Sequence, residues 1–343
     1  MIENIPTSDD FKEQGIWFLN LAWDAVFDLI SDFREFVEFS ISVLDHDYKE
    51  CLEYCDSDTD SKFVEFCKEA SNDEKYVEEV HNRYWEAAKK PLSVAHALSQ
   101  QGAELILKAK IAEVSPYLLI SNPPKEWPKE CDKQNTSFAD FRTIDAQDLI
   151  RAYHAVSQDK LPGDFVNNFN EFRKTRNAVF HTVDDRLEFS EKKIVTYILD
   201  IANICVPKQR PQLRQEYLEA SPAAQAIYID SCNNRLCNEM AMMIKLLGQK
   251  KLIELFGFDK KQRRYICPSC YWALERDYDP DYLLTAQLAP NKPDSTNVYC
   301  FVCGENRTVI RKDCQEDSCK GNVINTEDDI ECLTCFEAQD VEL

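Results

Sequence analysis

Glycine is scarce in this sequence, which has 7 glycines among 343 residues. That is about 2%, against a usual ~7%. Rossmann domains, P-loop domains and most β-rich folds need glycine at turns and phosphate contacts, so they are disfavoured. The strings G-x-x-x-x-G-K-[ST], G-x-G-x-x-G and G-x-S-x-G do not occur. This argues against nucleoside triphosphatases, dinucleotide-dependent enzymes and α/β-hydrolases, and it favours a helical protein.

Long hydrophobic runs are also missing. A membrane-spanning helix needs about 18 uncharged apolar residues, but the most apolar window, residues 15–30, is interrupted by Asn20, Asp24 and Asp28. Residues 1–4 carry no basic side chain of the kind that begins a secretory signal. We therefore expect a cytoplasmic protein without membrane association. In that compartment the 15 cysteines are thiols or metal ligands rather than disulfides.

The net charge of −21 is unevenly distributed along the chain. Residues 1–90 contain 23 acidic and 9 basic side chains, which gives −14. Residues 91–264 contain 22 and 25, which gives +3, and residues 265–343 contain 16 and 6, which gives −10. Only the middle segment is suited to attract a phosphate polymer. The acidic ends are expected to keep the protein in solution or to meet a protein partner, such as a regulator or sensor.

Apolar residues recur every three to four positions along most of the first 264 residues, which predicts helices. Proline suits the first turn of a helix, so Pro91 is expected to begin a long helix that runs to about Val114. Further helices are predicted at residues 145–156, 164–181 and 190–205, and two more between residues 211 and 256.

The predicted fold class is mainly α: a helical bundle with a four-helix core and extra N-terminal helices, followed by small C-terminal β units. At residue 265 short segments with proline, aspartate and paired cysteines replace the helical periodicity. We divide the chain into an acidic N-terminal helical region, a helical domain, a helical extension and a tandem four-cysteine domain, which are residues 1–90, 91–206, 207–264 and 265–343.

The C-terminal domain contains two sets of paired cysteines. Cys267 and Cys270 form one C-x2-C pair, and Cys300 and Cys303 form the next after 29 residues. Two such pairs can place four sulfurs around one Zn²⁺ ion. The second set is Cys314, Cys319, Cys332 and Cys335.

These two sets use all the cysteines of the domain, so we expect two structural Zn²⁺ ions per chain. Four protein ligands close a site and leave no open position for catalysis. The spacing allows either a sequential or an interleaved pairing of the cysteines. Four thiolates add negative charge around each ion, which makes docking onto protein more favourable than direct binding of nucleic acid.

One helix of the helical domain breaks its own apolar pattern. Phe165, Phe169, Phe172 and Val179 lie on one stripe, and Arg176 occupies the position of that stripe where a leucine is expected. A cation on a packed face is costly unless it is paired or functional.

His181 lies five residues after Arg176, about 140° further around the helix. The two side chains of one chain therefore point in different directions, whereas Asn177 shares the face of His181. Two interpretations stay open. In the first, Arg176 pairs with an acidic residue of its own core while His181 caps the helix end. In the second, Arg176 reaches His181 of a second copy across a two-fold axis.

The segment Arg176-Asn177-Ala178-Val179-Phe180-His181 resembles the R-x4-6-H motif of HEPN ribonucleases. The resemblance covers about residues 91–206, because a long helix precedes the motif and another helix follows it. Glu104 and Lys108 are similar to the E-x3-K element of some HEPN groups. From the residues alone, they are interpreted as a surface ion pair one helical turn apart.

The resemblance implies metal-independent cleavage of RNA by a homodimer, in a composite active site at the dimer interface. His181 would act as general base or acid on the ribose 2′-OH and the leaving 5′-oxygen. Arg176 would stabilise the phosphorane charge, and Asn177 would orient His181 or the phosphate. The products would carry 2′,3′-cyclic phosphate and 5′-OH ends. Most such nucleases are toxins or antiviral defence effectors, and they need no cofactor for catalysis.

Two other functions stay open at this level. In one, the chain is a catalytically silent helical module for protein interaction, with the zinc units as docking sites. In the other, it is a zinc-ribbon regulator that binds nucleic acid. The acidic tail and the lack of a basic recognition helix disfavour the regulator.

Overall fold

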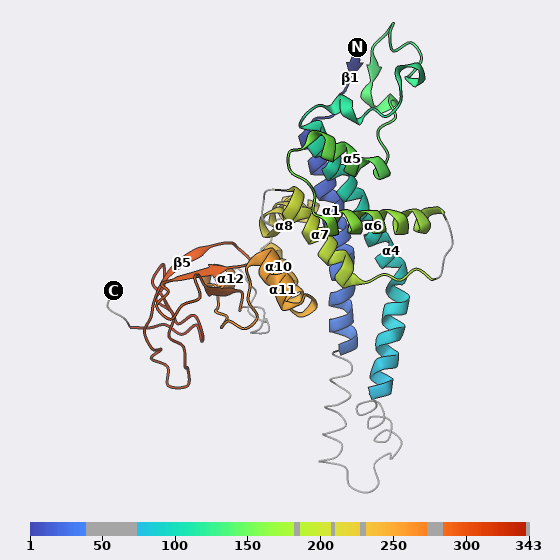
Figure 1. Ribbon diagram of the computed structural model, residues 1–343. Helices are drawn as coiled ribbons and strands as arrows, with labels where there is room; N and C mark the ends of the chain where they lie inside the picture. The colour runs from blue at the N-terminus through green and yellow to red at the C-terminus, as the bar shows by residue number, and fades with distance from the viewer. Residues whose placement is uncertain (39–73, 182–185, 207–209, 227–230, 273–283, 341–343) are drawn as a thin grey trace. The chain divides into compact units, whose positions relative to one another are not determined.

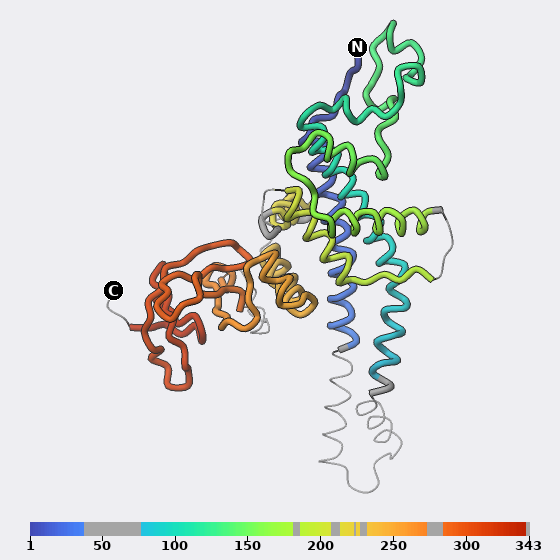
Figure 2. The backbone as a smooth tube through the Cα atoms, viewed as in Figure 1, coloured from blue at the N-terminus to red at the C-terminus, as the bar shows by residue number. Residues whose placement is uncertain are grey.

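The structure is a computed structural model, and the described part of the chain is coloured in Figures 1 and 2. It comprises residues 1–38, 74–181, 186–206, 210–226, 231–272 and 284–340. Two compact units form, residues 1–198 and residues 199–343. The described chain is mainly helical with a small antiparallel sheet near the C-terminus, which confirms the predicted fold class. Within those ranges, no helix has a run of apolar residues long enough to cross a bilayer.

The first unit is built from helices. These are α1 (Ser8–Asp32), α4 (Glu74–Ala112), α5 (Ala146–Val156), α6 (Gly163–His181) and the first part of α7 (Glu191–Cys205). A π-helical segment, Phe33–Glu38, follows α1, and single 3-10 turns lie at Pro116–Leu119, Pro124–Glu126 and Phe138–Asp140. Two short strands, β1 (Ile2–Glu3) and β2 (Thr136–Ser137), pair in parallel.

Local sequence sets the start of α1. A capping box begins α1, because Asp10 N donates to Thr7 Oγ1 at 3.2 Å and Thr7 N donates to Asp10 Oδ2 at 2.7 Å. Helices α5, α6 and α7 begin within one residue of their predicted positions and end at the predicted residues. The periodicity therefore located these three helices correctly.

Helices α1 and α4 lie side by side and antiparallel (Figure 1). A Cβ atom on Gly102 would lie 2.7 Å from a side-chain carbon of Leu19 and 2.9 Å from the carbonyl oxygen of Gly15. A Cβ atom on Gly15 would lie 2.9 Å from the Ile106 side chain. These glycines therefore let the backbones of α1 and α4 approach more closely than any larger residue permits.

Pro91 does not begin a helix, because α4 begins at Glu74 and continues through it. The expected boundary between residues 90 and 91 thus falls inside a continuous helix. Proline inside a helix costs about 3 kcal/mol, but α4 contacts α1 on both sides of Pro91. On one side Tyr84 donates to the carbonyl oxygen of Leu29 at 2.7 Å, and on the other Gly102 packs against α1. This packing outweighs the local preference.

Aromatic stacking fixes α6 in the core of the first unit. Phe169 and Phe172 are buried, and the Tyr197 ring of α7 stacks on Phe172 with the centroids 3.9 Å apart. The imidazole of His96, from α4, also stacks on Phe172 at 4.0 Å, and its Nε2 atom lies 3.2 Å from the Phe172 carbonyl oxygen. Burial lowers the pKa of His96 to about 4, although this hydrogen bond opposes the shift.

The helices of the second unit, after the end of α7, are α8 (Arg210–Glu219), α9 (Pro222–Ala226), α10 (Ser231–Leu246), α11 (Gln249–Phe256) and α12 (Pro268–Trp272). Four of these lie where two were predicted. Pro222 opens α9 and Gly248 caps α11, so each residue marks a break that the periodicity alone did not reveal.

A buried ion pair joins α8 to α10. Arg214 Nε donates to both carboxylate oxygens of Glu239 at 3.1 Å, and both side chains are almost fully buried. Arg235 also donates to Glu239, at 2.8 Å. Removing one member of such a pair leaves an uncompensated buried charge, so the pair fixes how these two helices pack.

Strands β3 (Ala286–Leu288), β4 (Asn297–Cys300), β5 (Asn306–Ile310) and β6 (Ile324–Asn325) form one antiparallel sheet in that order. Phe258, which follows α11, contacts Phe301 edge to face with the ring centroids 5.1 Å apart. The helical extension and the cysteine-rich domain, separate in the prediction, therefore share a core within the second unit.

Gly102→Ala tests the contact between α1 and α4. Alanine normally stabilises a helix relative to glycine, but here its methyl group would clash with the backbone of Gly15. We expect the free energy of unfolding to fall by about 1–3 kcal/mol, measured by urea denaturation. Gly163→Ala is the matched control, because nothing lies within 4 Å of a Cβ there. Equal stability of the two variants would contradict this packing.

The burial of His96 predicts a pH dependence of stability. Its folded pKa, about 4, lies below the ordinary value of 6.5. The unfolded chain therefore binds a proton first as the pH falls, and the free energy of unfolding decreases from pH 6.5 to pH 4. The His96 contribution to this decrease is on the order of 3 kcal/mol. Urea titrations of the protein and of His96→Gln should show a shallower decrease in the variant, and identical slopes would refute the assignment.

Candidate metal centres and the Arg176 network

Eight cysteines of the second unit form two compact groups. The groups are Cys267, Cys270, Cys300 and Cys303, and Cys314, Cys319, Cys332 and Cys335. Within each group the four sulfurs all lie within 4.8 Å of one another. The predicted sets of four are thus confirmed, and the pairing is sequential rather than interleaved.

The separations between the sulfurs match a metal centre. Cys267 Sγ lies 3.7 Å from Cys303 Sγ, and Cys270 Sγ lies 3.7 Å from Cys300 Sγ. In the second group the corresponding separations are 3.7 and 3.9 Å. Four sulfurs bound tetrahedrally at about 2.3 Å lie roughly 3.8 Å apart, whereas a disulfide bond is about 2.05 Å long. Each group therefore has the geometry of a closed, four-coordinate structural site.

Strand and turn geometry positions the first group. Its first two cysteines flank the start of α12, and Cys300 ends β4. Gly304, with φ of +75°, turns the chain after Cys303, as expected for a glycine that follows a cysteine pair. The backbone N–H of Val302 donates to Cys300 Sγ at 3.4 Å, which stabilises negative charge on that sulfur.

A further thiol lies beside the first group. Cys237, from α10, is fully buried and hydrogen-bonds to Cys270. The cysteine spacing of the tail contains no sign of this contact, because Cys237 belongs to a helix outside the cysteine-rich domain. The contact joins the first centre to the helical part of the same unit.

Gly321 leaves room for the second group. A Cβ atom at this position would lie 2.6 Å from Cys332 Sγ and 2.8 Å from the Thr334 side chain. The backbone N–H of Gly321 also donates to Cys319 Sγ at 3.2 Å. A side chain at position 321 would therefore displace a sulfur of the centre.

Gly321→Ala is expected to remove the metal from the second centre only. Metal analysis of the purified full chain should find two ions per chain, one for each group of four cysteines. The variant should retain about one, because a displaced sulfur opens the coordination shell. Gly248→Ala, which has nothing within 4 Å of its Cβ, should retain both ions. A metal content near zero in the unmodified protein would refute both sites.

A polar stripe runs along α4 in the first unit. We define it by His96, Gln100, Glu104 and Lys108, which follow one another at intervals of four residues. The first three are buried, so their polar atoms need partners inside the protein. Helices carry such residues in their cores only where neighbouring elements supply those partners.

The partners of the polar stripe come from different elements. Tyr197 of α7 donates to Gln100 Oε1 at 2.9 Å, and Gln100 Nε2 donates to Glu104 Oε1 at 3.1 Å. Lys108 Nζ donates to Thr143 Oγ1 at 3.0 Å. Burial lowers the pKa of Lys108, although the nearby charge of Glu104 opposes this shift. The predicted surface ion pair of Glu104 with Lys108 is therefore wrong, because both side chains point to other partners.

Arg176 binds to the same stripe. Its NH2 group donates to Glu104 Oε1 at 2.5 Å, and its side chain is 23% exposed. Its Nε atom is buried and has no hydrogen-bond partner among the described residues. The guanidinium thus lies against an interior carboxylate of its own chain, as the first interpretation expects of Arg176, and the part of that interpretation that concerns His181 stays a prediction.

The rest of the motif lies at the end of α6. The helix ends at His181, whose side chain falls outside the described part of the structure, as do residues 182–185. Asn177 is half-buried, and Phe180 is 66% exposed. The described contacts therefore place Arg176 against Glu104. The contact of Arg176 with His181 of a second copy stays a prediction.

No family model, curated protein or solved structure matches this chain. The HEPN resemblance thus rests on the motif and its helical context.

Proposed function

We propose that this chain is a metal-independent ribonuclease of the HEPN type, acting as a toxin or antiviral effector, and that two copies form its active site. The main support for this proposal is the position of Arg176 on α6. Its side chain is held by Glu104 of α4, and it lies five residues before His181. The arginine that breaks the apolar stripe is thereby fixed in one orientation within a helical core.

The ion pair with Glu104 leaves donors of Arg176 available. A guanidinium has five N–H donors, Glu104 engages one NH2 group, and the side chain of Arg176 stays 23% exposed. A partly exposed cation in a fixed orientation suits the non-bridging oxygens of a phosphate, where charge develops in a phosphorane. Glu104 then acts as a positioning residue.

Local charge also favours RNA at this end of α6. Residues 172–181 contain Arg173, Lys174 and Arg176 and no acidic side chain. In a chain with a net charge of −21, such a segment attracts a phosphate polymer where the acidic ends repel it.

In the proposed reaction, His181 accepts the proton of a ribose 2′-OH, and the freed oxygen attacks the adjacent phosphorus. The bond from phosphorus to the 5′-oxygen breaks, and that oxygen takes up a proton from a second acid, which the partner copy's motif supplies. Arg176 stabilises the charge on the phosphorane, and Asn177 orients His181 or the phosphate. The products carry 2′,3′-cyclic phosphate and 5′-OH ends.

For the two cysteine centres we propose zinc. Eight thiolates in two closed groups of four are the donor set that structural zinc favours. When bound, the ions neutralise the thiolates and cross-link the short strands of the second unit. They take no part in the proposed RNA cleavage.

A second candidate function is a catalytically silent scaffold for protein interaction. This candidate accounts for the contact of Arg176 with Glu104 as well, because a structural arginine also pairs with a core carboxylate. The two candidates differ in what His181 does, so the experiment must separate activity from stability.

Incubation of the full chain with labelled RNA, without added divalent metal, tests the ribonuclease. We expect cleavage products with 5′-OH ends that a polynucleotide kinase can phosphorylate. His181→Ala and Arg176→Ala should each lower the rate by about 10²–10⁴-fold, since each removes a transition-state interaction. His154→Ala, a histidine of α5 outside the motif, is the control and should cleave like the unmodified protein.

Arg176→Lys separates catalysis from a structural role. Lysine keeps the positive charge beside Glu104 but loses the planar set of donors. For the ribonuclease we expect a large loss of rate with a free energy of unfolding closer to the original than that of Arg176→Ala, because the buried carboxylate keeps a cationic partner. If RNA is not cleaved, or if all variants cleave alike, the ribonuclease proposal fails and the scaffold becomes the better account.

A further inference from the structure

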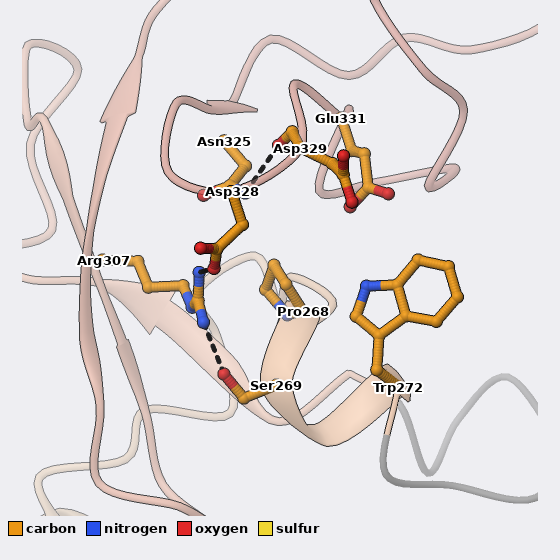
Figure 3. Close-up of a pocket in the computed structure, with 8 residues that line it drawn as sticks. All are labelled: Pro268, Ser269, Trp272, Arg307, Asn325, Asp328, Asp329 and Glu331. Carbon is orange, nitrogen blue, oxygen red and sulfur yellow. Dashed lines mark hydrogen bonds and ion pairs between the residues drawn. The ribbon is translucent and has the colours of Figure 1, made fainter.

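A pocket of about 480 Å³ lies between the two cysteine centres. Figure 3 shows its walls, which are Pro268, Ser269 and Trp272 from α12, Arg307 from β5, Asn325 from β6, and Asp328, Asp329 and Glu331 from the segment before Cys332. None of the functions considered above uses this pocket. Its size suits a side chain together with the adjoining backbone of a peptide.

Arg307 is the basic residue in the pocket wall, and its charge is already neutralised. Its guanidinium donates to Ser269 Oγ at 2.6 Å, to Asp328 Oδ2 at 3.0 Å and to Glu305 Oε2 at 3.2 Å. These contacts join the two cysteine centres (Figure 3). The pocket is therefore poorly suited to an anionic ligand.

The wall opposite Arg307 contains hydrogen-bond acceptor atoms that no donor contacts among the described residues. Glu331 lines the pocket and is 7% exposed, yet its Oε2 atom is buried without a hydrogen-bond partner among the described residues. The Oδ1 atom of Asn325 is also buried and has no hydrogen-bond partner among the described residues. Buried carboxylate oxygens are rarely left unpaired, because the loss of water is costly. Glu331 thus lacks a donor that a cationic ligand can supply.

Trp272 provides an aromatic face beside these acceptors. Its side chain is 62% exposed, an unusual exposure for the largest apolar side chain. In Figure 3 the carboxylates of Asp329 and Glu331 lie on the side of the pocket that faces the indole of Trp272. An ammonium or guanidinium group is attracted to an indole face and to carboxylates together.

A metal ion explains this pocket less well than an organic cation. In the described residues, the groups of His, Cys, Asp and Glu whose ligand atoms converge are the two cysteine groups, and the pocket acids are not among them. The volume also greatly exceeds that of one ion. An indole contributes nothing to a hard divalent cation, whose ligands are oxygen atoms.

We propose that this pocket binds a lysine or arginine side chain of a partner protein, with Glu331 accepting its hydrogen bond and Trp272 covering its charged group. The surrounding charge supports the same choice. Residues 265–343 have 16 acidic and 6 basic side chains, so the domain attracts a basic segment and repels nucleic acid. The inference does not depend on the ribonuclease.

The test follows the indole N–H of Trp272 in ¹H–¹⁵N spectra of the full chain. The chain has 5 tryptophans, and Trp272→Phe identifies the resonance. We expect N-acetyl-lysine methylamide to shift this resonance in a saturable way, and the arginine analogue to do the same. N-acetyl-norleucine methylamide, which has the same carbon chain without the ammonium, should not shift it.

Glu331→Gln should weaken the lysine probe about tenfold or more, since one charged hydrogen bond is worth at least that factor. Asp317→Asn removes an exposed charge in the loop between Cys314 and Cys319 and should bind like the unmodified protein. Metal content must stay the same in both variants, which excludes loss of the fold. Equal shifts by norleucine, unchanged binding by Glu331→Gln, no saturable shift, or a shift caused by an RNA oligonucleotide instead would each overturn the proposal.

Discussion

The buried polar stripe of α4 is the constraint on which the first unit depends. His96, Gln100 and Glu104, which are buried, and Lys108, which is partly buried, need polar partners that other elements supply. The Phe172 carbonyl, Tyr197, Arg176 and Thr143 are those partners, and they come from α6, α7 and the segment before α5. Helices α6 and α7 must therefore pack where their groups can form hydrogen bonds with the polar stripe. The opposite requirement, close apolar packing at Gly102, holds α1 against the same helix.

This arrangement changes how the motif on α6 is understood. Arg176 is both a partner of the stripe and the first residue of a sequence that resembles a catalytic motif. The two roles are compatible, because an arginine that already pairs with a carboxylate keeps further donors and loses conformational freedom before substrate binds. The cost is that Glu104 partly neutralises the charge that a phosphate would meet. Activity would therefore depend on donor geometry as much as on net charge.

In the second unit, the two four-cysteine groups draw together segments that a larger hydrophobic core would otherwise have to hold. The strands are short, from 2 to 5 residues, and strands of that length need additional cross-links to be stable. Each cysteine group closes a loop around these strands. The pairing of β5 with β6 joins the strands beside the first group to those beside the second in one sheet. The walls of the Trp272 pocket are then held by both centres, so its acidic residues are fixed by elements that are distant in sequence.

The sequence by itself determined the helices from 145 to 205, because apolar periodicity acts within a few residues. It also predicted two four-cysteine sites, since short spacings limit which sulfurs can meet, but it left sequential and interleaved pairings open, and the structure decided between them. The tertiary structure alone decided that α4 continues through Pro91, that Glu104 meets Arg176 rather than Lys108, and that Glu331 faces Trp272. These outcomes depend on contacts between residues far apart in the chain, where packing and the need to satisfy buried polar groups outweigh local preference.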